Sequence, residues 1–116
     1  MEAQKKAVLI RPPQPCHWGP TDECLRNGKI TRLSVTYQTC YIQTKAPAAD
    51  GQAIYLQLWL PDEVAPTRAL ANDVLLLQGK VKNYSPKVGF SLQFEGLSDG
   101  EESMLTMLVE HYSDKS

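Results

Sequence analysis

Alternating hydrophobic and polar residues divide most of the chain into short candidate strands. The clearest segments are 54–60, with the sequence IYLQLWL, and 88–94, with the sequence VGFSLQF. In both, every second residue is hydrophobic, which would place one face of a strand against a core. The same pattern, less regular, predicts strands over residues 29–37, 39–44 and 73–82.

A sixth, short strand is expected over residues 7–10, before a proline-rich stretch without a hydrophobic period. Residues 11–28 contain four prolines together with glycine, aspartate and asparagine. Because proline cannot donate a hydrogen bond to a neighbouring strand, we expect the strand to stop at Pro12. The prediction is therefore an irregular N-terminal segment over residues 1–28, followed by barrel strands over residues 29–97.

Turn signals separate the strands, and a helix is expected at the end. An Asp-Gly pair precedes the strand at 54–60, residues 62–72 are expected to form a proline-containing surface loop, and residues 83–86 are expected to join two strands into a hairpin. Ser98 and Glu101 then have the spacing of a capping box. The hydrophobic residues that follow recur at helical spacing and predict a helix over residues 98–113: Met104, Leu105, Leu108, Val109 and Tyr112.

Length and composition favour one small domain. With 116 residues, 42% of them hydrophobic, the chain can bury one core but not two. Six strands and one helix, without alternating βαβ units, indicate a mainly β barrel or sandwich. Since no apolar run approaches the roughly 20 residues of a membrane-spanning helix and no signal peptide is evident, we expect a cytoplasmic chain without membrane contacts. Its three cysteines are then expected to be reduced thiols.

Charge is divided unevenly along the chain. The net charge is -1, which gives no overall basic field for a nucleic-acid backbone. Residues 1–45, however, carry seven Lys or Arg against three Asp or Glu (+4), and residues 46–116 carry five against ten (-5). The cationic first part could face an anionic ligand or an acidic partner, or its charges could simply be solvated in loops.

From residue 29 to residue 112, the order of these features resembles the PilZ family. The matching pieces are Leu33-Ser34, residues 40–44, Asp50-Gly51, residues 56–61, residues 79–81, residues 89–94 and the capped helix from Ser98. The resemblance implies a six-stranded antiparallel barrel with a C-terminal α-helix. It also implies binding of the bacterial second messenger cyclic di-GMP, or, in members without the binding motifs, an adaptor role in signalling, type IV pilus assembly or motility.

The motifs of nucleotide-binding PilZ domains are altered here. Those domains carry an Arg-x-x-x-Arg pair and an Asp/Asn-x-Ser-x-x-Gly turn, but the fourth residues after Arg11 and Arg26 are proline and isoleucine. In the turn motif Ser34 is present, whereas Arg32 occupies the acidic position and Tyr37 the glycine position. Replacing an acceptor by a cation should weaken or abolish the usual nucleotide mode. We therefore expect a non-enzymatic adaptor that binds another protein.

Two sets of residues are candidates for binding. A rearranged basic and aromatic cluster could still hold cyclic di-GMP, and its members would be Arg11, Trp18, Arg26, Lys29, Arg32 and Ser34. An exposed aromatic platform could hold a partner protein, and its members would be Tyr37, Tyr41, Tyr55 and Trp59. Such aromatics could also stack on single-stranded nucleic acid in an OB-like barrel, although the chain's charge argues against it. The ordinary alternatives are scattered surface cations and aromatics packed under a loop.

The sequence gives little support for metal binding or catalysis. Cys16, His17, Cys24 and Cys40 have the chemistry of zinc ligands but lack Cys-x-x-Cys spacing. His111 is the one other histidine, and no nucleophile or phosphate-loop motif is present. We therefore expect no metal, no cofactor and no enzymatic activity, and the sequence leaves the oligomeric state open.

Overall fold

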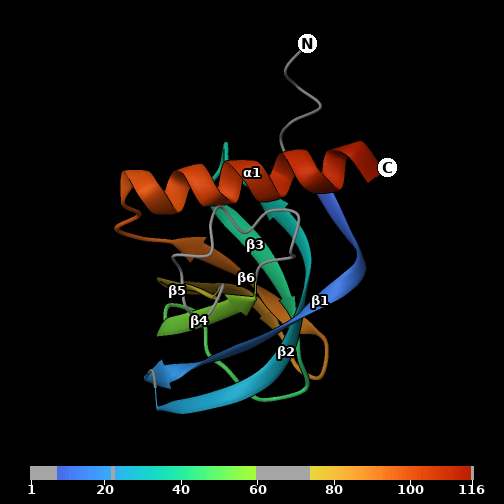
Figure 1. The fold of residues 1–116 in the computed structure, drawn as a ribbon. Coiled ribbons are helices and arrows are strands. Elements are labelled where there is room, and N and C mark those ends of the chain that lie inside the picture. Colours follow the sequence, from blue (N-terminus) through green and yellow to red (C-terminus); the bar gives the residue numbers. More distant parts are fainter. Residues whose placement is uncertain (1–7, 22, 60–73, 116) are drawn as a thin grey trace.

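The computed structural model, which describes residues 8–21, 23–59 and 74–115, is a closed antiparallel barrel with one helix across an end (Figure 1). Its elements are β1 (Val8–Thr21), β2 (Cys24–Ser34), β3 (Thr39–Gln43), β4 (Ala53–Trp59), β5 (Val74–Ser85), β6 (Gly89–Phe94) and α1 (Asp99–Lys115). Around the barrel the strands follow the order β1-β2-β3-β6-β5-β4. The mainly β class, the six-stranded barrel and the C-terminal helix are confirmed. The loop expected over residues 62–72 lies outside the described residues.

Strand β1 corrects the prediction of an irregular segment over residues 11–28. It runs through Pro12, Pro13 and Pro15, and β2 begins three residues after it ends. The register of β1 with β2 shifts between Leu9 and Gln14, so Pro12 and Pro13 lie in a bulge without partners on β2. On its other side, β1 pairs with β4 only over residues 16–19. Proline's missing N–H costs little at such unpaired positions, and this is why a strand can contain it.

The core fills the barrel with alternate side chains from every strand, and Trp18 is its largest member. The Trp18 indole is fully buried and meets the Phe90 ring edge to face, with centroids 4.9 Å apart. Gly28 makes room for it, because a Cβ there would lie 3.0 Å from Ile42 Cγ2 and 3.2 Å from Trp18 Cδ1. Interiors packed at this density leave no space for an added methyl group without rearrangement.

A bulge at Thr31 sets which side chains of β2 face outward. Ile30 pairs with Ile42 and Arg32 pairs with Tyr41, so Thr31 has no partner on β3. The extra residue keeps Ile30 and Leu33 both buried in the barrel and leaves Arg32 exposed on its outside. The strand begins at Cys24 and ends at Ser34, and residues 35–38 form a turn. The strand expected over residues 29–37 therefore starts five residues too late and ends three residues too late.

The β5–β6 hairpin is confirmed, with a longer first strand than expected. β5 continues to Ser85, three residues past Lys82, before the turn into β6. The inner face of β5 is buried as predicted, and Leu76 is 43% exposed on the outer face. Position 76 lies beside Gln57 of β4, another outward-facing position.

Helix α1 begins with the predicted capping box and packs its apolar side on the barrel (Figure 1). The Glu101 N–H donates to Ser98 Oγ (3.1 Å), and the Ser98 N–H donates to Glu101 Oε1 (2.9 Å). The residues of the predicted stripe face the core. Met104 is partly buried, and the other four are buried: Leu105, Leu108, Val109 and Tyr112. The helix is not sufficiently long and apolar to cross a membrane, and the described residues contain no other α-helix.

Removing the cap should weaken the helix measurably. We expect Ser98→Ala to lower the free energy of unfolding by about 1 kcal/mol, because two N–H groups at the start of the helix lose their acceptors or their geometry. Urea unfolding followed by circular dichroism measures this. Ser103→Ala, at an exposed position within the helix, is the control and should leave stability unchanged or slightly higher. Equal effects of the two substitutions would show that the cap contributes nothing.

Candidate functional site

The six candidate ligand residues do not converge on one site. Trp18 pairs with Arg26 near one end of the β1–β2 pair, whereas Leu9 pairs with Arg32 near the other. Arg11 is exposed in the β1 bulge. Arg26, Lys29 and Arg32 recur every three residues in the sequence, but the Thr31 bulge places Lys29 and Arg32 together on the outer face, whereas Arg26 lies over Trp18. The structure therefore does not form the basic and aromatic cluster as one unit.

Trp18 and Arg26 form a contact of their own at the barrel end away from the helix. As cross-strand partners, their side chains leave the sheet on the same side, and the guanidinium carbon lies 5.5 Å from the centroid of the Trp18 rings. Arg26 is exposed and covers an indole that is itself fully buried. The indole N–H has no acceptor among the described residues. A ligand could not stack on this ring without displacing its cover.

Ser34 closes the β2–β3 turn. Its side chain is 3% exposed, and its hydroxyl oxygen accepts the Tyr37 N–H at 3.2 Å. Gln38, with φ of 55°, adopts the left-handed conformation, and its side-chain amide donates to Glu102 Oε2 of α1 at 3.2 Å. The turn is thereby fixed to the helix. The positive φ falls on Gln38, so the backbone does not require glycine at position 37.

Arg32 lies in an outward-facing row that crosses three strands. It pairs with Leu9 of β1 on one side and with Tyr41 of β3 on the other. Leu9 is 45% exposed and Tyr41 is half-buried. The next outward row along these strands pairs Lys29 with Gln43. We call these five residues the β2–β3 wall. It combines two cations with aliphatic, aromatic and amide side chains, and it carries no carboxylate.

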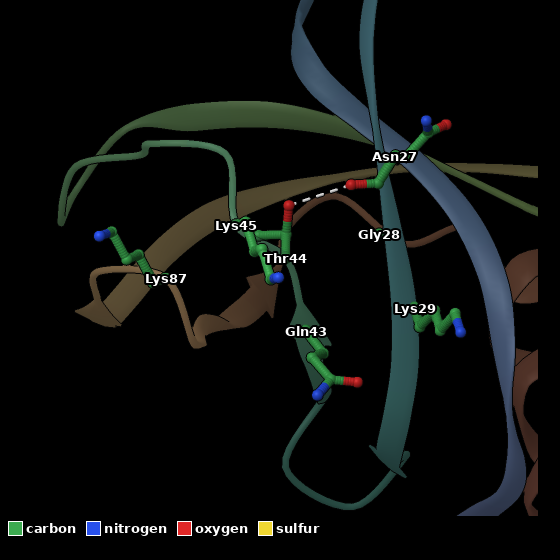
Figure 2. Close-up of a pocket in the computed structure, with 7 residues that line it drawn as sticks. All are labelled: Asn27, Gly28, Lys29, Gln43, Thr44, Lys45 and Lys87. Carbon is green, nitrogen blue, oxygen red and sulfur yellow. Dashed lines mark hydrogen bonds between the residues drawn. The ribbon is translucent and has the colours of Figure 1, made fainter.

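A pocket of about 370 Å³ adjoins the end of the β2–β3 wall formed by Lys29 and Gln43 (Figure 2). The described residues that line it are Asn27, Gly28, Lys29, Gln43, Thr44, Lys45 and Lys87. We call it the lysine pocket, because three of the seven carry a positive charge and none a negative one. The sequence did not identify Lys45 and Lys87 as candidate binding residues. Lys45 follows β3 and Lys87 lies in the β5–β6 turn, and nothing in the sequence indicates that either is close to Lys29.

Thr44 fixes the geometry of the lysine pocket. It is buried, and its hydroxyl donates to the Asn27 carbonyl of β2 (3.0 Å) and accepts the Ala46 N–H (3.2 Å). Its own N–H donates to the Val88 carbonyl in the β5–β6 turn at 3.1 Å. One side chain and one amide therefore tie together the three chain segments that supply the lysines.

The four candidate aromatics are distributed around the barrel. Tyr41 is on β3 and Tyr55 and Trp59 are on β4, which is three strands away from β3 in either direction. Tyr37, 53% exposed, lies in the β2–β3 turn. Trp59 is 38% exposed and meets the His17 ring edge to face at 4.9 Å. The structure thus does not bring them into a single platform.

The cysteines described are core thiols. Cys16 and Cys40 are buried and free. Burial raises the pKa of the Cys16 thiol to about 12 and that of Cys40 well above its usual value, the latter with a smaller contribution from Cys16. Both are therefore protonated near neutrality. Within the described ranges, no three His, Cys, Asp or Glu side chains gather closely enough to hold a metal ion.

The comparisons with known proteins show a resemblance of fold. No protein-family model matches the chain, and no curated protein matches it in sequence. Three solved structures match it closely in three dimensions. The PilZ domain of CeSA from a cellulose-synthesizing bacterium superposes with a TM-score of 0.64 at 16% identity, covering 90% of this chain and 96% of that one.

The other two structures come from named bacteria. The inhibitor of motility MotI/DgrA of Bacillus subtilis gives a TM-score of 0.70 at 12% identity, covering 96% of this chain and 52% of that one. The PilZ domain of YcgR from Escherichia coli, solved with cyclic di-GMP, gives 0.68 at 13% identity, covering 94% and 89%. With the closed barrel and its helix, these matches show that the chain has a divergent PilZ-like fold.

Proposed function

We propose that this chain is a non-enzymatic regulatory domain that acts in the cytoplasm by binding another protein through the β2–β3 wall. The supporting observation is the outward placement of Arg32 between Leu9 and Tyr41. Arginine and tyrosine contribute strongly to protein interfaces, and an exposed leucine beside them adds apolar area. The same wall has no carboxylate that would neutralise Arg32 or Lys29.

Regulation as a class of function is supported by the structural neighbours. One neighbour is an inhibitor of motility, and another is a PilZ domain solved with cyclic di-GMP. The nucleotide itself fits this chain less well. The acidic position of the turn motif is Arg32, Ser34 is buried and holds the Tyr37 N–H, and Trp18 is covered by Arg26. We therefore propose a role in bacterial signalling or motility without the usual cyclic di-GMP mode.

Calorimetric titration with cyclic di-GMP separates the adaptor from a nucleotide receptor. We expect no saturable heat at micromolar concentrations, because Arg26 lies over Trp18 near one end of the β1–β2 pair and Arg32 near the other, so the two arginines do not form a clamp. Saturable binding that Arg32→Ala or Arg26→Ala abolishes would overturn the proposal and establish a receptor with rearranged contacts.

Site-specific photo-crosslinking tests protein binding through the β2–β3 wall. A photoreactive phenylalanine at position 41 should give one defined product with a partner in the cells that naturally make the chain. The control is the same residue at position 55, a half-buried outward tyrosine on the opposite side of the barrel. We expect Arg32→Glu to remove the product from position 41, because it reverses the charge beside the crosslinker. Equal crosslinking from both positions, or none, would contradict the proposed surface.

A further inference from the structure

The lysine pocket adds a specific expectation about the partner. We propose that it binds an extended acidic segment of the protein that docks on the β2–β3 wall, an inference that rests on the proposed function. The pocket begins where the wall ends, because Lys29 and Gln43 belong to both. A partner that covers Arg32 and Tyr41 could therefore continue into the pocket along the same two strands.

The arrangement of the lysines favours an extended ligand over a compact one. Figure 2 shows Lys45 over Thr44, with Lys29 and Lys87 extending toward opposite sides of the view. The three ammonium groups therefore lie apart and do not close around a single point. Carboxylates distributed along an extended chain can contact such separated cations, whereas one phosphate group would reach only part of them.

The positive charge of the pocket is not neutralised within the described part of the chain. The ion pair described there joins Lys80 to Glu95, at 3.7 Å, and involves none of the pocket lysines. A concave surface lined by one sign of charge concentrates ligands of the opposite sign. Each exposed lysine contributes little by itself, so binding should require several contacts and should weaken with salt.

The lining also distinguishes a peptide from a nucleic acid. None of the seven lining residues is aromatic, whereas binding of single strands commonly uses base stacking on aromatic rings. The Asn27 and Gln43 amides can instead donate to carboxylates or to a peptide backbone. Because Thr44 ties the three lysine-bearing segments together, the pocket is formed before a ligand arrives, which lowers the entropic cost of binding.

Fluorescence anisotropy with a labelled oligoglutamate peptide tests the pocket. The full chain should bind this peptide at a low salt concentration of about 20 mM and lose most of the binding at about 200 mM, as screening shortens the range of the charges. We expect Lys45→Glu with Lys87→Glu to weaken binding by about tenfold or more, because two favourable charges become repulsive.

The matched control is Lys80→Glu with Lys82→Glu, which changes the net charge equally at exposed positions of β5 outside the pocket lining. It should change binding by no more than about twofold, since the charges lie farther from the peptide. Equal weakening by the two double variants, or no binding at low salt, would overturn the inference. Tighter binding of a single-stranded oligonucleotide than of oligoglutamate, lost in the pocket variant, would also overturn it in favour of nucleic acid.

Two further measurements keep the outcomes distinct. Thermal unfolding should show that both double variants are folded, the control being slightly less stable because Lys80→Glu loses the ion pair with Glu95. Lys45→Gln with Lys87→Gln replaces the first variant if charge reversal disturbs folding. The crosslink from position 41 reports on the β2–β3 wall separately. If that crosslink persists while oligoglutamate fails to bind, the wall is retained and the pocket is rejected.

Discussion

Replacing Trp18 with alanine should lower the free energy of unfolding by about 3–5 kcal/mol, the usual range for removing a fully buried large aromatic residue. The loss combines apolar burial with the edge-to-face contact to Phe90 and leaves a cavity that the closed barrel cannot readily fill. Urea unfolding followed by far-ultraviolet circular dichroism measures the change. In a domain of this size, the expected loss removes a large part of the total stability.

Two companion variants identify the cause. Trp59→Ala removes a tryptophan that is partly exposed and packed on His17, and it should cost less than about 1.5 kcal/mol. Trp18→Phe should be milder than Trp18→Ala, because the indole N–H has no acceptor among the described residues and its removal breaks no bond seen there. Similar costs for Trp18→Ala and Trp59→Ala would contradict the assignment of Trp18 as the centre of the core.

Gly89→Ala should be the second strongly destabilising change, at about 3 kcal/mol. Gly89 begins β6 with φ of 150°, and an added Cβ would overlap the Ile42 carbonyl oxygen of β3, at 2.1 Å. Since that oxygen belongs to the backbone of a neighbouring strand, the two strands would have to separate. The same unfolding experiment measures the effect.

Gly96→Ala is the matched control for Gly89→Ala. Gly96 also has a positive φ, of 64°, but an added Cβ there would meet no atom within 4 Å. Only the intrinsic cost of a side chain in the left-handed region remains, roughly 1 kcal/mol. If both substitutions cost the same, close packing of β3 against β6 is not what requires glycine at position 89.

Elements with a regular local pattern were predictable from the sequence. Strands β4 and β6 alternate between hydrophobic and polar residues without interruption. Turn-forming residues flank them in the sequence, Asp50-Gly51 and Pro61 around β4 and Pro86 and Gly96 around β6. The helix has its cap, Ser98, and its apolar stripe within 15 consecutive residues, so no distant contact is needed to recognise it. The resemblance to the PilZ family then supplied the closure of the barrel, which local patterns alone left open between a barrel and a sandwich.

Features that depend on strand partners were missed. Pro12 and Pro13 of β1 are tolerated because of a register shift against β2, and a register is not visible in one strand alone. Likewise, the even spacing of Arg26, Lys29 and Arg32 suggested one cluster, but the unpaired Thr31 puts Lys29 and Arg32 on the outer face while Arg26 lies over Trp18. The lysine pocket depends on Thr44 holding the β5–β6 turn against β2, a contact between segments far apart in the sequence.

Closure of the barrel limits how another molecule can recognise this domain. Each of the six strands has hydrogen-bonded neighbours on two sides over at least part of its length, so few strand edges are left on which a partner could extend the sheet. Recognition must then come mainly from side chains that point away from the barrel, and these can be exchanged one at a time while the interior is preserved. Such an architecture lets binding preferences diversify without refolding, in keeping with domains that share this shape at only 12–16% identity.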